Sequence, residues 1–356
     1  MKTTDSIYRK LPDALLPWYR KNARVLPWRQ DTEPYHIWLS EIMLQQTRVE
    51  AVRTHYLRFL EQLSDVHALA KVPESRLFKL WEGLGYYNRA RNLQKAAQMI
   101  ETQYNGCFPN QYKDIRALPG IGPYTAGAIA SICFNLPYAA VDGNVLRIIT
   151  RITENNAPID CMQTKTEIAA QLEKVYPKNS CGQFTQALME LGAMVCTPRS
   201  PKCAECPANN FCRAYANGTV LQYPVKQPKK DKRLEERTVF LLQCEDRYAL
   251  TKRTESGLLS GLWQLPNVQG KMDVEQALHA ADTFGVQPVE VYKQMHRIHV
   301  FTHIKWQMTC YHISCTKKPS DFTWASAQEI QTVYALPTAF RMFFEFSNET
   351  DKTKSN

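Results

Sequence analysis

The sequence predicts two domains, an all-α domain followed by a smaller α+β domain, and three observations support this fold class. Apolar residues recur every three or four positions from Leu11 to about Cys212, as in helices that bury one face. The stretch KQPKKDKRLEER at 226–237 is strongly charged and reads as an exposed linker. From about Thr238 the segments TVFLLQ, YALTKR and HVFTHIKWQMTCYHISC have the β-branched and aromatic content of strands, with one clear helix at 274–286.

Composition limits the classes of protein that fit. The chain has 356 residues, a net charge of +10 and a pI of about 9.0, which favours a polyanionic partner, nucleic acid first. The N-terminal residues lack the apolar core of a secretory signal, and no apolar run is long enough to span a membrane. We therefore expect a cytoplasmic protein without membrane contact, whose eleven cysteines stay reduced.

The first polar residue of interest lies in an apolar helix. We expect one helix over about Tyr35 to Gln46 and a new one from Thr47, where T-R-V-E has the form of a capping box. Glu41 falls inside the first helix among apolar neighbours. Taken alone, such a glutamate faces solvent or pairs with a base such as Arg48.

The stretch LPGIGPYTAGAIA at 118–130 predicts a tight turn between two helices. Gly120 and Gly122 permit positive φ, and Pro123 suits the first position of the following helix. The outward backbone N–H groups of such a turn can receive a phosphate, although a glycine turn alone is common in helical hairpins. Downstream, Asp142 in VDGNV is by itself an N-cap for the next apolar helix.

Four cysteines cluster at the end of the helical region. Cys196, Cys203, Cys206 and Cys212 have the spacing C-x6-C-x2-C-x5-C. Four thiolates at such spacing indicate a metal site, and zinc and iron–sulfur both remain open on this evidence.

These motifs together resemble one enzyme family. The hairpin resembles that of the helix–hairpin–helix DNA glycosylases, the cysteine spacing resembles the [4Fe–4S] loop of the endonuclease III superfamily, and WLSEIMLQQTRVE at 38–50 resembles the signature of adenine DNA glycosylases. GLLSGLWQLPNV resembles the entry to a Nudix fold. The resemblance runs from LPWR at 26–29 to about Phe340.

The resemblance implies a domain plan. A helical glycosylase domain at 1–217 would include the iron–sulfur loop 196–212 and be followed by a linker at 218–237. A Nudix-like lesion-recognition domain at 238–346 and a disordered tail at 347–356 would complete the chain. The cofactor would be a [4Fe–4S] cluster, with zinc the alternative, and the nearby basic residues Arg199, Lys202 and Arg213 would suit phosphate contacts.

The resemblance also implies roles for four catalytic residues. Glu41 matches the general acid and Asp142 the carboxylate that stabilises the sugar cation, while Tyr124 and Asn144 match residues that orient them. Tyr124 stands where endonuclease III-type lyases carry a lysine, and a tyrosine cannot form an imine. Leu146 likewise replaces a lysine found in some members, so we expect a monofunctional glycosylase.

Contacts with DNA are implied in the same way. Gln46 and Tyr86 match residues that wedge into the duplex, and one of Tyr86 and Tyr87 should be a core residue instead. Phosphate or DNA contacts are expected at Gly120, Gly122 and Arg29. The loop that reads 8-oxoguanine in the opposite strand is expected at Phe301, Thr302 and His303, with threonine in place of the family's serine.

The resemblance thus implies a monomeric base-excision-repair enzyme. It would remove adenine paired with 8-oxoguanine, and less efficiently with guanine, from double-stranded DNA by base flipping. An endonuclease III-like nicking enzyme and a non-catalytic, metal-stabilised binder of damaged DNA are the alternatives. A Nudix hydrolase is not expected, because EQALHAADTFGV lacks the clustered glutamates that hold Mg²⁺.

Overall fold

The computed structural model describes residues 2–228, 231–254 and 257–344, with side chains from residue 5, and divides into two compact units. Unit 1 comprises residues 1–71 and 88–228, and unit 2 comprises residues 72–87 and 229–356. The short segment 72–87 is therefore the one place where unit 2 includes residues from the N-terminal half. The expected disordered tail at 347–356 lies outside the described residues.

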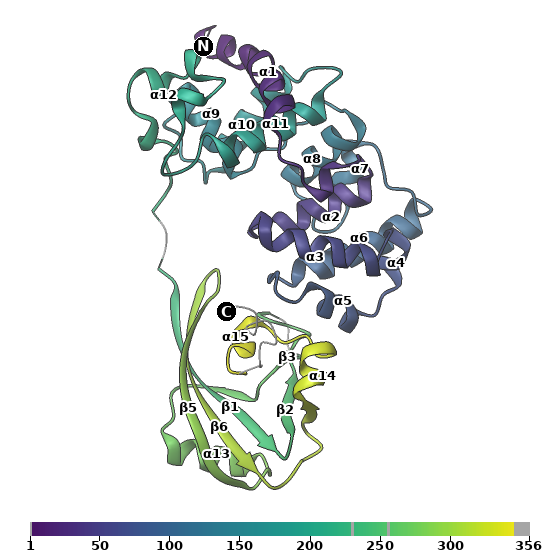
Figure 1. Cartoon of the computed structure of the whole chain (residues 1–356), viewed down its shortest axis with the longest axis vertical. Helices are drawn as coiled ribbons and strands as arrows, with labels where there is room; N and C mark the ends of the chain where they lie inside the picture. The colour runs from purple at the N-terminus through teal and green to yellow at the C-terminus, as the bar shows by residue number, and fades with distance from the viewer. Residues whose placement is uncertain (1, 229–230, 255–256, 345–356) are drawn as a thin grey trace, which may run out of the picture. The chain divides into compact units, whose positions relative to one another are not determined.

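Unit 1 is helical, as predicted (Figure 1). Its α-helices are α1 (Lys2–Asn22), α2 (Pro34–Leu44), α3 (Val49–Gln62), α4 (Val66–Lys71), α6 (Asn88–Gln103), α7 (Tyr112–Ala117), α8 (Pro123–Phe134), α9 (Gly143–Thr153), α10 (Met162–Glu173), α11 (Cys181–Met194) and α12 (Arg213–Ala216). Helices α1, α9, α10 and α11 share a hydrophobic core. Helix α8 is buried almost all round because α2, α7 and α11 pack against it.

The turn between α2 and α3 differs from the prediction. Helix α2 ends at Leu44 and α3 begins at Val49, with Arg48 at the N-cap and no side-chain cap bond, so the capping box is wrong. The hydroxyl of Thr47 instead donates to the carbonyl of Gln45 at 3.3 Å and accepts from Arg89 at 3.3 Å. Arg89 also donates to the carbonyls of Ile42, Met43 and Gln45, so it satisfies the end of α2.

Unit 2 contains a mixed sheet. Among the described residues, seven strands form it: β1 (Arg233–Cys244), β2 (Arg247–Lys252), β3 (Trp263–Gln264), β4 (Asn267–Gln269), β5 (Pro288–Val300), β6 (Ile304–Cys315) and β7 (Thr323–Ser326). The main order is β3-β2-β1-β6-β5, with β1 and β6 parallel and the other pairs antiparallel. Its helices are α5 (Glu74–Trp81), α13 (Val274–Thr283), α14 (Ala327–Thr332) and α15 (Thr338–Arg341).

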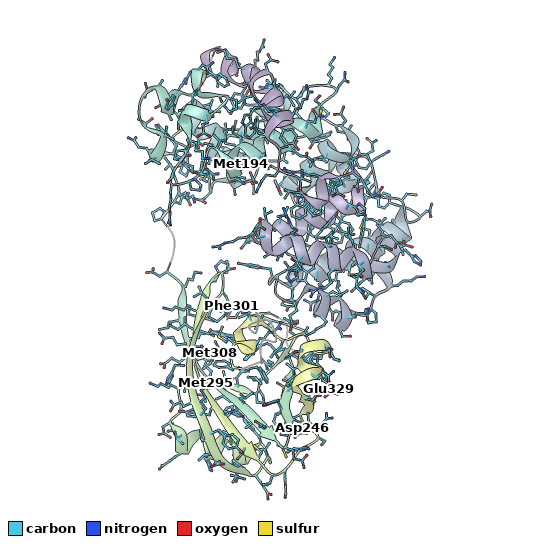
Figure 2. The ribbon with its side chains drawn as sticks, in the orientation of Figure 1. Met194, Asp246, Met295, Phe301, Met308 and Glu329 are labelled. Atoms are coloured by element: carbon cyan, nitrogen blue, oxygen red, sulfur yellow. The ribbon has the colours of Figure 1, made fainter. Side chains whose placement is uncertain are left out.

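The two faces of this sheet bury separate cores. One core contains Met295 and Met308 of β5 and β6 together with residues of α14 and α15, and the other lies under α13. Figure 2 labels Met295 and Met308 on the paired strands and Phe301 at the turn between them. Strand β1 begins at Arg233, inside the stretch expected to be linker, because it pairs with β6 from the residue where β6 starts. Residues 233–237 are exposed or half-buried, so pairing with β6 rather than burial makes this charged stretch a strand.

Candidate active site

Glu41 lies on α2 with its side chain 5% exposed and faces the hairpin helix α8. The hydroxyl of Tyr124, in the first turn of α8, donates to Glu41 Oε2 at 2.6 Å. Desolvation raises the pKa of Glu41 to about 7; the nearby charge of Asp142 adds to this, while the Tyr124 bond and the charge of Arg29 oppose it. A carboxyl with this pKa can hold a proton near neutral pH.

Asp142 is both the N-cap of α9 and a neighbour of Glu41. Its Oδ1 accepts the backbone N–H of Val145 at 2.8 Å, and its Oδ2 accepts Asn144 Nδ2 at 2.8 Å. Burial raises the pKa of Asp142, whereas these bonds and the charge of Arg147 act in the opposite direction. The N-cap interpretation from the sequence is confirmed, and it does not compete with a chemical role, because the cap holds the carboxylate in place.

Asn144 is held from two further sides. Arg147 Nη2 donates to Asn144 Oδ1 at 2.8 Å, and the same guanidinium donates from Nε to the carbonyl of Cys196 at 2.8 Å. A Cβ on Gly192 of α11 would lie 2.5 Å from Asn144 Cβ, so only glycine allows this approach. Asp142 is thereby connected through Asn144 and Arg147 to the backbone of the first cysteine of the loop.

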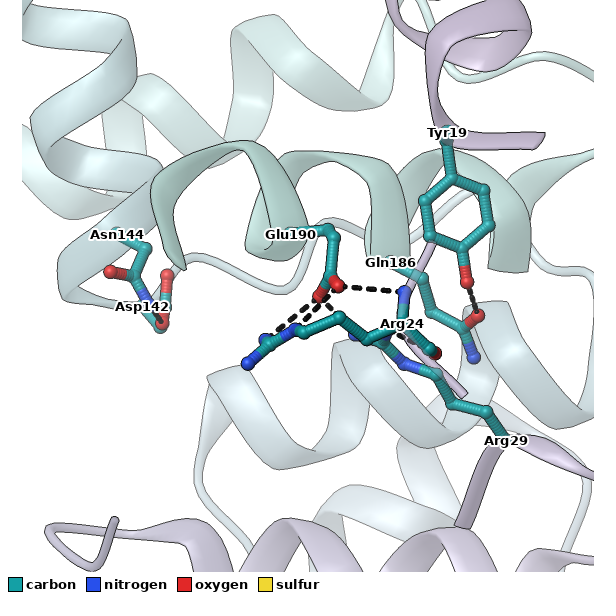
Figure 3. A network of polar contacts seen from close by, with 7 residues as sticks. All are labelled: Tyr19, Arg24, Arg29, Asp142, Asn144, Gln186 and Glu190. Carbon is teal, nitrogen blue, oxygen red and sulfur yellow. Dashed lines mark hydrogen bonds and ion pairs between the residues drawn. The ribbon is translucent and has the colours of Figure 1, made fainter. Parts of the chain in front are cut away.

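A second buried glutamate was missed by the sequence reasoning. Glu190 of α11 has a side chain that is 0% exposed, and its oxygens accept Arg24 Nε at 2.7 Å and Arg29 Nη2 at 2.7 Å (Figure 3). Those bonds hold the pKa of Glu190 at about 2, against the effect of burial. The signal in the sequence is an acid in the apolar run ALMELGAM, the same kind of signal that marked Glu41.

The structure places Arg29 in this network. Its side chain is 13% exposed and bonded to Glu190, with a further bond to the carbonyl of Arg24 at 3.4 Å. The guanidinium is close enough to Glu41 to lower its pKa. Arg29 therefore forms an ion pair with one buried carboxyl, that of Glu190, and lowers the pKa of a second, that of Glu41. The expected contact of Arg29 with DNA stays a prediction.

The hairpin has the predicted start, with one correction. Gly120 has φ of +79°, and a Cβ there would lie 2.7 Å from Asn92 Cβ, whereas Gly122 has φ of −84° and is the N-cap of α8. Pro123 is the first residue of that helix, as expected. Arg116 Nη1 donates to the carbonyl of Ile121 at 2.5 Å, which closes the turn, and Pro123 at the start of α8 is exposed.

The two expected wedge residues share an uncommon backbone conformation. Gln46 has φ of +58° and Tyr86 has φ of +48°, and both side chains are exposed. Non-glycine residues rarely adopt this region, and they concentrate at functional sites. Tyr87, by contrast, is 8% exposed and packs edge-on against Phe78, so Tyr87 is the core member of the tyrosine pair.

The expected lesion-reading loop is the turn between β5 and β6. Phe301 N–H bonds the carbonyl of Ile304 at 2.8 Å, and the Phe301 ring packs edge-on against Trp306 at 4.8 Å. Thr302 and His303 are exposed at the tip. One aromatic residue thus anchors the turn and two polar side chains are presented to solvent.

The four predicted metal ligands line one pocket, whose wall also includes Arg151 of α9. Arg151 Nη1 donates to Cys196 Sγ at 3.3 Å, and burial together with the neighbouring thiols raises the pKa of Cys206 to about 12. Four cysteines that ionised around one pocket would need a compensating cation. Within the described residues no group of three or more His, Cys, Asp or Glu converges on a single ion.

Comparisons with known proteins agree with this architecture. Residues 39–178 match the family model of the HhH-GPD superfamily of base excision DNA repair proteins, and residues 238–345 match that of the NUDIX domain. A trapped endonuclease III–DNA covalent intermediate has a TM-score of 0.52 and 26% identity, covering 60% of this chain and 98% of that one. A thermostable thymine-DNA glycosylase has a TM-score of 0.55 and 29% identity, covering 60% and 99%. The fold and site define a helix–hairpin–helix DNA glycosylase joined to a Nudix-like domain.

Curated relatives show which family of DNA glycosylases this chain resembles. An adenine DNA glycosylase of Buchnera aphidicola subsp. Baizongia pistaciae is 38% identical over 265 residues, covering 73% of this chain and 74% of the relative. The adenine DNA glycosylase of Mus musculus is 31% identical, covering 95% and 78%, and that of Homo sapiens is 30% identical, covering 93% and 72%. The chain belongs to the adenine DNA glycosylase family. Among the described residues, no helix is long and apolar enough to cross a membrane.

Proposed function

We propose that this protein removes adenine from duplex DNA when the adenine is paired with 8-oxoguanine, and less efficiently when it is paired with guanine. The observation that carries the proposal is the pair formed by Glu41, with a pKa raised to about 7, and Asp142, which is held by Val145 and Asn144. An acid for the leaving group and a carboxylate for the sugar are the two groups that glycosidic hydrolysis needs.

Glu41 acts as the general acid. Because the pKa of Tyr124 lies well above its ordinary value, its hydroxyl keeps its proton and donates to Glu41 Oε2. The transferable proton of Glu41 is then on Oε1. Its transfer to a ring nitrogen of the flipped adenine lets the base leave neutral, as the C1′–N9 bond breaks and the sugar becomes an oxocarbenium-like cation.

Asp142 acts on the sugar. Its oxygens accept hydrogen bonds from Asn144 and Val145, and the remaining lone pairs can face the cation. A water molecule then adds to C1′ and loses a proton, and the products are free adenine and an abasic site. Tyr124 cannot form an imine, so the strand stays intact and the enzyme is monofunctional.

The remaining predicted residues bind DNA. The N-terminus of α8 after Gly120 and Gly122 would hold a phosphate beside the flipped nucleotide. Gln46 and Tyr86 would fill the gap in the duplex, and Phe301, Thr302 and His303 would read 8-oxoguanine. Unstacking costs a few kcal/mol and least at a mismatch, which contributes to selectivity.

The cysteine pocket would hold a [4Fe–4S] cluster through Cys196, Cys203, Cys206 and Cys212. The cluster would supply the positive charge that keeps four thiolates together and would stiffen the loop, with no part in bond cleavage. Bound iron and sulfide, with visible absorbance lost on oxidation, would support the proposal. A colourless protein that carries one zinc ion would overturn it.

The decisive experiment uses a duplex with one adenine opposite 8-oxoguanine and the adenine strand labelled. Wild type and Glu41→Gln are incubated with it, and each sample is divided between alkali and no alkali. Strand cleavage only after alkali, and only with wild type, is the expected result. Nicking without alkali would mean a lyase, and binding without base loss by wild type would mean a damage-binding protein.

A further inference from the structure

Helix α5 and the turn after it form part of unit 2, with the C-terminal domain. Residues 72–87 fall inside the helix–hairpin–helix match at 39–178, yet they form one compact unit with residues 229–356. The same unit therefore contains Tyr86, the expected wedge, and the loop of Phe301, Thr302 and His303. A polar cluster joins this segment to the C-terminal helices.

The centre of the cluster is the carboxylate of Glu82, the residue that follows α5. Its Oε1 accepts the backbone N–H of Leu336 at 2.9 Å, and its Oε2 accepts Lys79 Nζ at 2.8 Å and Arg341 Nη1 at 3.0 Å. The Glu82 side chain is 8% exposed. A buried carboxylate with two cationic partners and a backbone donor holds a defined position, because any shift leaves a charge without compensation.

Lys79 extends the cluster to the end of α14. Besides Glu82, its ammonium donates to the carbonyls of Ile330 at 3.0 Å and Tyr334 at 3.1 Å. The three ammonium hydrogens are thus all used, and the side chain is 15% exposed. Such a fully bonded lysine fixes the orientation of α5 against the C-terminal helices.

The turn that carries Tyr86 begins immediately after Glu82. Gly83 and Gly85 have φ of +98° and +68°, and Trp81 Nε1 donates to the carbonyl of Gly85 at 3.0 Å. At the tip, Thr302 Oγ1 donates to the hydroxyl of Tyr86 at 3.3 Å. The base of the turn is held by Glu82 and its tip contacts the expected lesion-reading loop.

We propose that Lys79, Glu82 and Arg341 form a polar latch that holds Tyr86 in register with Thr302, and that Glu82 thereby sets the preference for 8-oxoguanine over guanine opposite the adenine. The inference rests on the proposed function. A base read by Thr302 influences adenine extrusion only if the residue that fills the gap is held beside the reading loop. Glu82 is a positioning residue, since it acts through Tyr86.

The test compares single-turnover adenine release from two duplexes, with adenine opposite 8-oxoguanine or opposite guanine. The ratio of the two rates should fall about tenfold or more in Glu82→Ala, because the 8-oxoguanine substrate loses its advantage. Glu275→Gln, an exposed glutamate of α13 in the same unit, is the matched control and should keep the wild-type ratio. A general loss of folding would lower both rates together and leave the ratio unchanged.

A double-mutant cycle with Tyr86→Ala tests whether Glu82 acts through Tyr86. If the latch acts through Tyr86, adding Glu82→Ala to Tyr86→Ala should lower the ratio no further. Arg341→Gln, at a position whose side chain is 43% exposed, provides a milder variant should Glu82→Ala fail to fold, and its ratio should fall by a smaller factor.

The outcomes separate the two proposals. An unchanged ratio in a latch variant whose circular dichroism spectrum matches that of wild type would overturn the latch. So would a Glu82→Ala loss that multiplies the Tyr86→Ala loss. In both cases wild type would still release adenine. Absence of adenine release by wild type from either duplex would overturn the proposed function itself.

Discussion

Glu41 and Glu190 are both buried glutamates on apolar helices of unit 1, yet their surroundings drive their pKa values apart. Glu41 is 5% exposed and has a tyrosine donor and a nearby carboxylate, and its pKa rises to about 7. Glu190 is 0% exposed and bonded to two arginines, and its pKa falls to about 2. Both side chains are buried, so their hydrogen-bonding and charged partners decide whether the carboxyl is protonated or ionised near neutral pH.

This comparison assigns different functions to similar residues. A carboxyl that stays protonated near pH 7 suits proton transfer, and a carboxylate that never protonates near pH 7 suits structural neutralisation of Arg24 and Arg29. Arg29 connects the two, because it bonds Glu190 and lowers the pKa of Glu41. Because the two glutamates have different roles, substitution of Glu41 should mainly lower the rate of adenine release, and substitution of Glu190 should mainly lower stability.

The largest effect is expected on stability at Glu190. Glu190→Ala leaves Arg24 and Arg29 buried or half-buried without their carboxylate, which should lower the free energy of unfolding by about 3–5 kcal/mol. Urea denaturation measures this change. Glu167→Ala, an exposed glutamate on α10, is the control and should cost less than about 0.5 kcal/mol. Equal losses at the two positions would contradict the role given to the arginine pairs.

The next effect is on catalysis at Glu41. Glu41→Gln keeps the size of the side chain and an acceptor for Tyr124 but has no proton to transfer. Single-turnover adenine release should fall about 10³-fold, or about 4 kcal/mol, while the fold persists. Circular dichroism and duplex binding check the fold. A variant that retained a tenth of the rate would exclude Glu41 as the acid.

The raised pKa of Glu41 and the lowered pKa of Glu190 should change the dependence of stability on pH in opposite directions. Above about pH 7, Glu41 ionises and the rate of adenine release should fall up to tenfold per pH unit. Because its folded pKa is raised above 4.5, stability also declines as pH rises from about 4.5 to 7, and Glu41→Gln should remove this decline. Glu190 has a lowered pKa, so its contribution is present above about 4.5 and lost as pH falls towards 2.

Melting curves and rates measured from pH 3 to 9 would separate these windows. A rate that is flat from pH 6 to 9 would mean that Glu41 is not the titrating acid. Acid stability that is unaffected by Glu190→Ala would mean that another carboxylate controls the low-pH limb.

The smallest effect is expected for Tyr124→Phe. The Tyr124 hydroxyl bond lowers the pKa of Glu41, so its removal should move the alkaline limb of the rate profile to higher pH, by about one unit or less. The rate at pH 6 should change less than about tenfold. A limb that moved to lower pH would reverse the assigned direction of this bond.

Several parts of the site could be predicted because the interactions are local. The contact between Asp142 and Asn144 spans two residues at a helix N-terminus, where capping rules apply. Pro123 begins α8 as its fixed φ requires. Thr47 shows where local rules fail, because Arg89, forty-two residues away, engages the hydroxyl that the capping box needed.

Other parts depended on tertiary structure. Glu41 and Tyr124 are 83 residues apart, and Glu190 is 161 residues from Arg29. The periodicity of the sequence does not reveal such pairs. Glu41 and Glu190 both lie in apolar runs, yet their pKa values shift in opposite directions. The placement of 72–87 with the C-terminal domain was likewise invisible, since Glu82 bonds Leu336 across 254 residues.

The sequence by itself determined the helical and strand-rich halves, the cysteine motif and the identities of the hairpin and the two expected catalytic carboxyls. Each depends on residue type and short spacing, which the backbone expresses within one or two turns. Tertiary structure alone decided that Glu41 rather than Glu190 has a raised pKa, and that Tyr86 rather than Tyr87 is exposed. It also decided that β1 begins within the expected linker, at Arg233. Those outcomes depend on long-range charge and burial, which arise only when distant segments pack together.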